Sequence, residues 1–363
     1  RDTDRSRGLG DVYKRQELIL ILHWRNMIYR NWLGIIGVAC ILFVSCKPTE
    51  VDVPITYYSS FLLKDTTVML SKVEMDPMQV NARCMVWDGD KRVLVRTSTT
   101  DSIYAVFAYP EMKFLSYTGS LSEYKQILAK CNEGFYLVKD DSLYLYHLTD
   151  KDLLQKTTTH FLYNSNKIRL SKIKKLNDKM YTAHAYTDPS YNDIRLNEFY
   201  MLDAENNILY PKGHYPERTE VRFKTIFDFK FAYAHEVWPK PDGSRILVNY
   251  VRTRRFRIYD LSARLLHDVC LDYASNKYVV DADPKRWTTF IRDCFVTDKY
   301  IYLLCPEGEQ SSLVIVDWEG RPIARYRLDE KIFFFFIDPD RNLFCGINSN
   351  NGQSFYFLDL DIN

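Results

Sequence analysis

The chain has 363 residues, of which 49 are basic, 47 are acidic and 15% are aromatic. Seven of the basic and four of the acidic residues precede Cys46, so the rest of the chain carries 42 basic and 43 acidic residues. This near-neutral part lacks the basic surface that nucleic acid requires, which excludes a nucleic-acid partner. Many aromatic residues and only 13 glycines favour strands and exclude a long disordered chain.

The first 55 residues have the pattern of targeting sequence. Residues 1–16 are polar and show no periodicity, and the first methionine is Met27, so we exclude residues 1–26 from the fold as a non-native leader. Residues 27–45 are predicted to be a signal peptide, because Arg30 precedes an apolar run over residues 32–44. This run of 13 residues is shorter than the about 20 residues that a membrane-spanning helix needs.

The signal peptide ends in LFVSC (residues 42–46), which is similar to the bacterial lipoprotein signal. The resemblance implies cleavage before Cys46 and diacylation there, and two acyl chains give lasting membrane attachment. An uncleaved short anchor and a simple secretory signal are the alternatives. Residues 46–55 would then be a polar tether. We expect a protein of the bacterial cell envelope, lipid-anchored to the outer membrane, with the periplasmic or surface face left open.

Residues 286–329 provide the template for a repeated unit. They contain four short apolar runs separated by turn residues, which predicts a four-stranded meander. The predicted strands are residues 290–296, 300–305, 313–318 and 323–328. Such a meander cannot bury both of its faces alone, so copies of it must stack against one another.

Six turns rich in Asn, Asp and Gly recur along the chain at steps of 42 to 65 residues. They are centred on Asp90, Glu133, Asp178, Gly243, Asp298 and Asp340. Four-stranded units at this period are typical of a β-propeller. We therefore predict an all-β, six-bladed propeller over residues 56–363, with four-stranded antiparallel blades. The N- and C-terminal strands would close it, since the last unit has three strands and residues 56–63 or 67–70 can supply the fourth.

Three of the third strands end in an aspartate between apolar residues, at Asp203, Asp260 and Asp317. We interpret these aspartates as turn-forming residues at strand ends, in preference to a binding site.

Three stretches near the C-terminus, FVTDKYIYLL, IVDWEGRPIARYRLD and FFIDPDRNLFCGI, carry a family resemblance. They resemble the closing blades of the TolB-like six-bladed propeller lipoproteins of Bacteroidota-type bacteria. The likeness extends more weakly from Tyr57 to the end. The resemblance implies a propeller fold and a location in the cell envelope, and it implies no established activity. The Gly-Pro-Glu loop of that family corresponds here to residues 118–124, which keep the Gly and the Glu but lack the Pro.

Six cysteines follow Cys46, and an even number in an exported protein allows disulfides. Most of them lie in apolar strand runs, where a free cysteine behaves as a small hydrophobic residue. The disulfide state is therefore left open, although a tight hairpin at residues 298–299 would place Cys294 opposite Leu303. There is no CxxC pair to support a zinc site.

The chain lacks the G-x-S-x-G, H-E-x-x-H, G-x-G-x-x-G and Walker motifs. Residues 338–342 have the oxygen spacing of a calcium loop, but a hairpin turn explains them better, because Leu343 replaces the turn glycine. We predict no cofactor, no metal and no catalytic residue.

The candidate ligand-binding residues are two histidines and three arginines. His184 lies in the second strand of the third unit, and His235 lies on an innermost strand of the fourth, where it would face the propeller channel. Arg252, Arg254 and Arg255 belong to the basic run VRTRRFRIY, which we assign to a loop. Such a loop can hold an anionic sugar or phosphate through bidentate contacts. The alternatives are ordinary strand histidines and a solvated turn whose charges block edge pairing.

These patterns favour a non-enzymatic binding or scaffold module at the cell envelope. The membrane, through the lipid anchor, and an envelope protein or glycan are the expected partners. The main alternative is a propeller hydrolase, lyase or lactonase-like enzyme acting on a small molecule or glycan in the central funnel. A structural partner of an outer-membrane transport complex is a third reading.

Overall fold

The computed structural model describes fifteen stretches of the chain. They are residues 53–58, 64–75, 84–97, 102–120, 129–131, 134–139, 142–161, 168–177, 179–187, 197–203, 205–206, 208–216, 226–271, 288–348 and 354–362. All of them belong to one compact unit, Val53–Asn363. The leader, the signal peptide, Cys46 and most of the tether lie outside the described residues. Within those residues, no helix is long and apolar enough to cross a membrane.

The described strands form six sheets, which we number in chain order. The first three sheets each contain four antiparallel strands. Sheet 1 contains β4 (Met85–Trp87), β5 (Arg92–Arg96), β6 (Ser102–Ala108) and β7 (Lys113–Ser120). Sheet 2 contains β8 (Ala129–Cys131), β9 (Gly134–Lys139), β10 (Ser142–Leu148) and β11 (Leu154–Phe161). Sheet 3 contains β12 (Ile168–Lys175), β13 (Met180–Thr187), β14 (Phe199–Asp203) and β15 (Ile208–Lys212).

The last three sheets also contain strands from the start of the domain. Sheet 4 contains β16 (His235–Pro239), β17 (Arg245–Tyr250), β18 (Arg255–Asp260), β19 (Leu265–Leu271) and β1 (Ile55–Tyr58). Sheet 5 contains β20 (Asp293–Val296), β21 (Tyr300–Glu307), β22 (Gln310–Asp317), β23 (Pro322–Leu328) and β2 (Asp65–Val68). Sheet 6 contains β24 (Phe334–Asp338), β25 (Leu343–Ile347), β26 (Ser354–Asp359) and β3 (Ser71–Glu74). A short helix, α2 (Ile226–Ala232), which the sequence analysis did not predict, precedes sheet 4.

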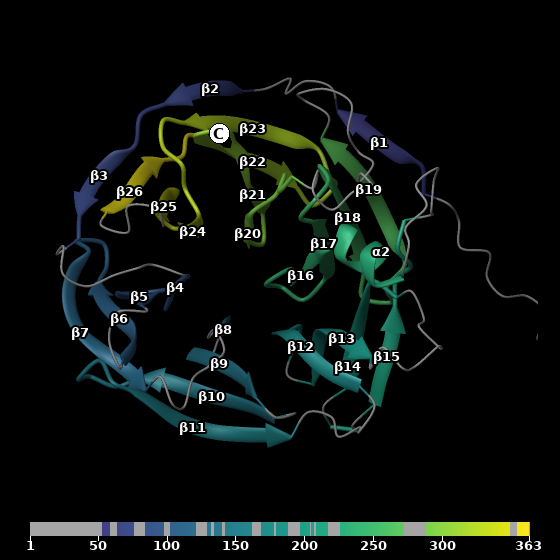
Figure 1. Cartoon of the computed structure of the whole chain (residues 1–363), viewed down its shortest axis with the longest axis horizontal. Helices are drawn as coiled ribbons and strands as arrows, with labels where there is room; N and C mark the ends of the chain where they lie inside the picture. The colour runs from purple at the N-terminus through teal and green to yellow at the C-terminus, as the bar shows by residue number, and fades with distance from the viewer. Residues whose placement is uncertain are drawn as a thin grey trace, which may run out of the picture. The chain divides into compact units, whose positions relative to one another are not determined.

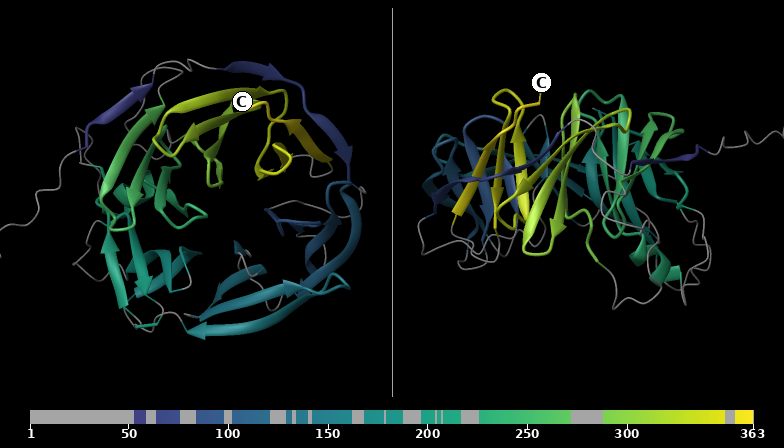
Figure 2. Two further views of the ribbon diagram at one scale, coloured as in Figure 1. Left: turned by 180° about the vertical axis from the view of Figure 1, so that it is seen from behind. Right: turned by 90° about the horizontal axis from the view of Figure 1, so that it is seen from above.

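The sheets follow one another around a ring, with the first strand of each sheet innermost (Figure 1). The prediction of an all-β protein with four-stranded antiparallel blades in a propeller arrangement is confirmed. The template unit is confirmed as β20–β23, and each turn of the predicted series falls between the first two strands of a sheet. Figure 2 shows α2 standing out from one face of the ring.

Strands in the middle of the sheets are apolar along their whole length because both faces of each sheet are covered. In β22, Leu313, Val314, Ile315 and Val316 are completely buried. Leu313 and Ile315 pack against sheet 6, while Val314 and Val316 pack toward sheet 4. Continuous apolar runs are typical of strands that are buried on both faces. Stacking between neighbouring sheets is therefore the main source of stability in this fold.

The last sheet packs directly against the first. The indole of Trp87 in β4 stacks on the Phe336 ring in β24, with ring centroids 5.2 Å apart. The hydroxyl of Tyr109 donates a hydrogen bond of 2.8 Å to the Asp338 carboxylate. These contacts connect parts of the chain that are more than 200 residues apart.

The N-terminal segment runs along the outside of three sheets. The strands β1 and β2 pair in parallel with the outer strands β19 and β23, and β3 pairs with β26 in antiparallel fashion. The N-terminal segment supplies the missing strand of sheet 6, but the expected residues, 56–63 or 67–70, were wrong. The outermost strand of a blade is solvent-exposed, so the largely exposed Ser71–Glu74 fits this place better than an apolar run does.

Aspartates at strand ends organise the turns. The Oδ1 atoms of Asp203, Asp260 and Asp317 each accept hydrogen bonds from two backbone amides of the following turn, at 2.8 to 3.1 Å. Asp338 likewise accepts from the amides of Asp340 and Arg341. The interpretation of the first three as turn residues is confirmed. The contacts of Asp338 agree with a hairpin at residues 338–342.

The cysteine side chains that the structure describes are buried thiols. They are Cys84, Cys270, Cys294, Cys305 and Cys345. Cys294 pairs with Leu303 across the hairpin, as the turn predicted. Burial raises the pKa of the Cys84 thiol to about 12, which keeps it protonated and inert.

Candidate functional site

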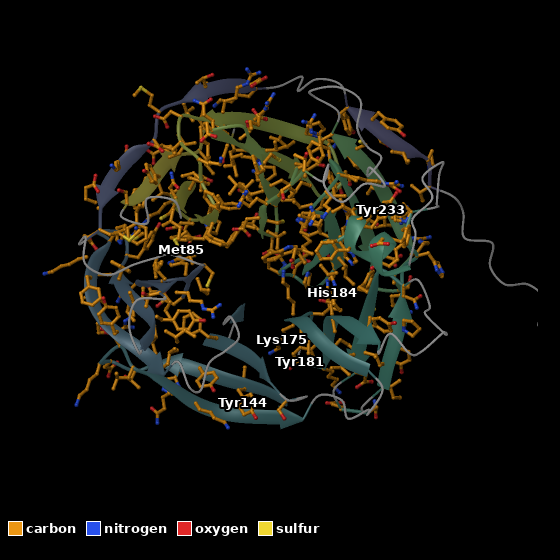
Figure 3. The ribbon with its side chains drawn as sticks, in the orientation of Figure 1. Met85, Tyr144, Lys175, Tyr181, His184 and Tyr233 are labelled. Atoms are coloured by element: carbon orange, nitrogen blue, oxygen red, sulfur yellow. The ribbon has the colours of Figure 1, made fainter. Side chains whose placement is uncertain are left out.

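The two candidate histidines lie next to each other at the junction of sheets 3 and 4. His184 is on β13 (Figure 3), and His235 begins β16. Their ring centroids are 4.6 Å apart with planes tilted by 32°. The sequence analysis had named them separately, on different units. Their contact depends on how sheet 3 packs against sheet 4.

His235 is 3% exposed and is held between two backbone carbonyls. Its Nδ1 lies 2.9 Å from the Tyr233 oxygen, and its Nε2 lies 2.6 Å from the Glu198 oxygen. A carbonyl oxygen only accepts hydrogen bonds, and a neutral imidazole has a single N–H to donate. The two ring nitrogens contact oxygens from two segments, one before β14 and one before β16. His235 therefore links sheet 3 to sheet 4.

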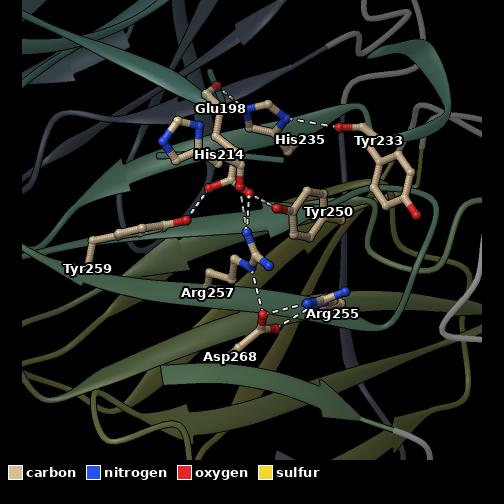
Figure 4. Close-up of polar contacts among 9 residues, drawn as sticks. All are labelled: Glu198, His214, Tyr233, His235, Tyr250, Arg255, Arg257, Tyr259 and Asp268. Atoms are coloured by element: carbon tan, nitrogen blue, oxygen red, sulfur yellow. Dashed lines mark hydrogen bonds and ion pairs between the residues drawn. The ribbon is translucent and has the colours of Figure 1, made fainter. Parts of the chain in front are cut away.

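Arg255 and Arg257 belong to β18, and both are buried at 8% exposure. The sequence analysis assigned the basic run to a loop, which is wrong for Arg255. The two arginines share one face of the strand because side chains alternate along it. Asp268 lies directly opposite Arg257 on β19. Its carboxylate accepts from Arg255 Nε at 2.6 Å and from Arg257 Nε at 2.8 Å (Figure 4).

Glu198, just before β14, is the second buried carboxylate of this cluster. It accepts hydrogen bonds from the hydroxyls of Tyr250 and Tyr259 and, at 3.1 Å, from Nη1 of Arg257 (Figure 4). Burial raises the pKa of Glu198 to about 7, and the neighbouring Arg257 opposes this rise. Arg257 Nη1 also donates to the His214 carbonyl at 2.7 Å.

Gly213 provides the space that Glu198 occupies. Its φ of +64° lies in the left-handed region, and a Cβ atom there would lie 2.8 Å from Glu198 Oε2. A side chain at position 213 would therefore push the carboxylate away from its donors.

We call Glu198, Arg255, Arg257 and Asp268 the buried charge network. Its two basic and two acidic side chains are paired with one another, which a buried cluster requires. It joins strands of sheets 3 and 4 and fixes the start of β18. The loop of residues 251–254, which ends where β18 begins, therefore projects from a rigid base.

Arg252 and Arg254, the other two candidate arginines, lie in this loop and stack on phenylalanine rings. The Arg252 guanidinium carbon is 5.1 Å from the Phe231 ring centroid, and that of Arg254 is 4.9 Å from Phe290. Arg252 Nε also donates to the Phe231 carbonyl at 3.3 Å. Phe231 of α2 is 49% exposed, so this loop and α2 together present cationic and aromatic groups at the surface.

A third set of polar groups comes from the innermost strands of sheets 3, 4 and 5. The Lys174 ammonium lies 2.8 Å from the Trp238 ring centroid. Asp293 keeps part of its surface exposed, yet burial raises its pKa to about 7. Lys174 lowers that pKa and Glu236 raises it further, so the three charges lie within reach of one another. The Asp293 carboxylate accepts from the amides of Cys294 and Phe335.

Across the described stretches of the chain, no group of three or more His, Cys, Asp or Glu side chains is placed to hold a metal ion. The lipidation residue Cys46 falls outside those stretches.

Sequence reasoning missed Glu198 and Asp268. The available signal was the alternation in RFRIYD, which puts Arg255, Arg257 and Tyr259 on one face of a strand. Two arginines inside a packed sheet need buried acids as partners. Asp268, a single acid in the strand LLHDVCL, was a visible candidate for that role.

Comparisons with known proteins agree with this fold. No family model matches the chain, and no curated protein sequence matches it either. A crystal structure of a DUF4221 family member from Bacteroides vulgatus is similar, with a TM-score of 0.52 and 8% identity, over 80% of this chain and 96% of that one. The Cps50 (Swd1) β-propeller domain of Myceliophteria thermophila matches at a TM-score of 0.47 and 10% identity, over 80% of this chain and 100% of that one. The likeness to the Bacteroides structure establishes a shared fold.

Proposed function

We propose that this chain is a lipid-anchored, non-enzymatic binding module of the bacterial cell envelope, built on a closed six-bladed propeller. Six sheets, contact between the last and the first, and completion of sheet 6 by β3 support the closed ring. The LFVSC sequence at residues 42–46 supports a lipid anchor on Cys46, and likeness to a Bacteroides protein is compatible with a TolB-like lipoprotein of the outer membrane.

One observation carries the binding function. The loop of residues 251–254 presents Arg252 and Arg254 at the surface, while the buried charge network fixes the strand that follows it. A rigid base lowers the entropy that a loop loses when it binds a partner.

The lipid anchor is tested by changing Cys46→Ser in the full chain and following incorporation of labelled palmitate. We expect the label to disappear and the protein to leave the membrane fraction. Cys40→Ser is the matched control, because it changes a cysteine inside the signal peptide and should keep the label. A Cys46→Ser protein that stays in the membrane fraction would show that another segment anchors it.

The binding function is tested with a photo-crosslinking amino acid placed on either face of the ring. Phe231 marks the face that carries the loop of residues 251–254, and Leu261, 44% exposed in the turn after β18, marks the opposite face. We expect envelope components to crosslink at position 231 and not at position 261. Equal labelling at both positions, or none at either, contradicts a binding face there.

Asp293 supports the alternative of an enzyme. With a pKa of about 7 and with Lys174 and Glu236 nearby, it has the properties of a general acid or base at neutral pH. The test is hydrolysis of lactones, aryl esters and oligosaccharides by the full chain and by Asp293→Asn. Turnover that Asp293→Asn abolishes favours the enzyme, and a lack of turnover in the parent protein favours the binding module.

A further inference from the structure

The arginine–phenylalanine contacts extend beyond the loop of residues 251–254. Arg292, just before β20, has its guanidinium carbon 4.2 Å from the ring centroid of Phe333, just before β24. Together with Arg252 on Phe231 and Arg254 on Phe290, this gives three stacked pairs along sheets 4, 5 and 6. We call Arg252, Arg254 and Arg292 the arginine rim.

The three pairs lie on one face of the ring. Phe231, Arg292 and Phe333 precede the innermost strands of successive sheets, and all innermost strands start on the same face. The loop of residues 251–254 joins the second and third strands of sheet 4, so it returns to that face. Figure 2 shows α2, which carries Phe231, on this face.

Backbone hydrogen bonds join these segments into one surface. The amide of Val251 donates to the Ala234 carbonyl at 2.8 Å, and the amide of Phe290 donates to the Val251 carbonyl at 2.8 Å. The amide of Phe335 donates to the Asp293 carboxylate at 3.3 Å, which ties sheet 5 to sheet 6. The Asp293 carboxylate also interacts with Arg292 and partly offsets the effect of burial on the pKa of that arginine.

Stacking on a ring covers one flat side of a guanidinium and restricts its orientation, while its hydrogen bonds run from its planar edge. That planar fork matches a carboxylate, which it binds through two parallel hydrogen bonds. The rim arginines are half-buried, and burial lowers the pKa of Arg252 and Arg292. A partly desolvated cation gains more from an incoming anion than a fully hydrated one does.

We propose that the arginine rim binds an acidic polysaccharide, with uronate carboxylates on the guanidinium groups and sugar rings against the aromatic edges. This proposal rests on the binding function proposed above and names the ligand class. Three cationic positions over three sheets suit a chain with repeated carboxylates better than one small anion. The exposed face of Phe231 adds an apolar contact that a phosphate ion cannot use but a sugar ring can.

The test uses the full chain in detergent and measures its affinity for polygalacturonate, with neutral dextran as the uncharged probe. We expect binding to polygalacturonate alone. Each of Arg252→Gln, Arg254→Gln and Arg292→Gln should weaken it up to about fivefold, and the triple variant about a hundredfold. Arg254→Lys should recover only part of the loss, because lysine keeps the charge and lacks the fork.

Two arginines on the opposite face are matched controls. Arg264 and Arg321 lie in the turns after β18 and β22, with side chains 77% and 66% exposed. The pair Arg264→Gln and Arg321→Gln changes net charge in the same direction and should leave the affinity unchanged. A loss equal to that of the rim variants would mean unspecific attraction and would overturn the proposal. Unchanged near-ultraviolet circular dichroism identifies the variants that are still folded.

Phosphate chemistry is the competing outcome. If inorganic phosphate or phosphatidylglycerol vesicles bind the rim and polygalacturonate does not, the acidic polysaccharide is the wrong ligand. If polygalacturonate does not bind while position 231 still crosslinks to envelope components, the acidic polysaccharide is rejected as the ligand, and the proposed binding function is retained. If neither binds, both proposals fail.

Discussion

Sheet 4 shows two different surfaces on the two sides of one strand. On the polar side of β18, Arg255 donates to Asp268 of the neighbouring strand β19, while Arg257 and the Tyr259 hydroxyl donate to Glu198, which precedes β14 of sheet 3. Phe256 and Ile258 face sheet 5, where they pack in an apolar cluster with Val314 and Val316. The apolar side gains stability from contact area, which does not depend on pH. The polar side depends on complete pairing, so removal of one member should cost more than loss of apolar contact.

Arg257→Met should have the largest effect on this comparison. The substitution removes the ion pair of Arg257 with the buried Glu198 and one of the two arginine partners of Asp268. Breaking such a buried pair should lower the free energy of unfolding by about 3 to 5 kcal/mol. The measurement is urea unfolding. Arg264→Met is the control, since its exposed pair with Asp260 should be worth less than about 1 kcal/mol. Equal costs for the two variants would mean that the buried charge network does not hold sheets 3 and 4 together.

Ile258→Ala tests the apolar side of the same strand. Ile258 is completely buried, and truncation should cost about 3 kcal/mol through lost contact and a cavity. Because no charge is involved, the cost should be the same at pH 5 and pH 8. A cost that changes between these pH values would show that the two faces of sheet 4 are coupled.

The stability of the polar side should fall as pH rises. The pKa of Glu198 is about 7 in the folded protein and 4.5 as an ordinary value, so the folded form keeps a proton that the unfolded chain has released between these values. Raising the pH through this window should remove about 2 to 3 kcal/mol of unfolding free energy.

The measurement compares the parent protein with Glu198→Gln from pH 4.5 to pH 7.5. The slope should be smaller in the variant. Asp293, whose pKa is also raised to about 7, contributes in the same direction, so the double variant with Asp293→Asn should have the smallest slope. Parallel curves for all three proteins would contradict the assignment.

Gly213→Ala should have the smallest effect, about 2 kcal/mol, because the new Cβ crowds Glu198 in a left-handed backbone conformation. Gly308→Ala is the control. Its φ of +67° is similar, but no atom lies within 4 Å of a new Cβ, so only the backbone cost of about 1 kcal/mol remains. If both variants lose the same unfolding free energy, glycine is needed at position 213 only for its left-handed backbone conformation and not for the space it leaves to Glu198.

The elements that could be predicted are those whose signal is local. The turn aspartates Asp203, Asp260 and Asp317 bond to amides within four residues, so their role is visible in a short window. The candidate site was predicted only in part. Arg252 and Arg254 lie in a loop as expected, whereas Arg255 lies in β18, because the residue at which a strand starts depends on its neighbouring strands.

The sequence alone determined the repeated four-stranded unit, its turns and the candidate arginines and histidines, because alternation and turn chemistry act over a few residues. Tertiary structure decided which charges meet. Glu198 reaches Arg257 across 59 positions and His184 reaches His235 across a sheet boundary, and only stacking of sheet 3 on sheet 4 brings them together. It also decided that Ser71–Glu74 completes sheet 6. This outer strand is largely exposed, so its sequence has no apolar pattern that would predict its pairing.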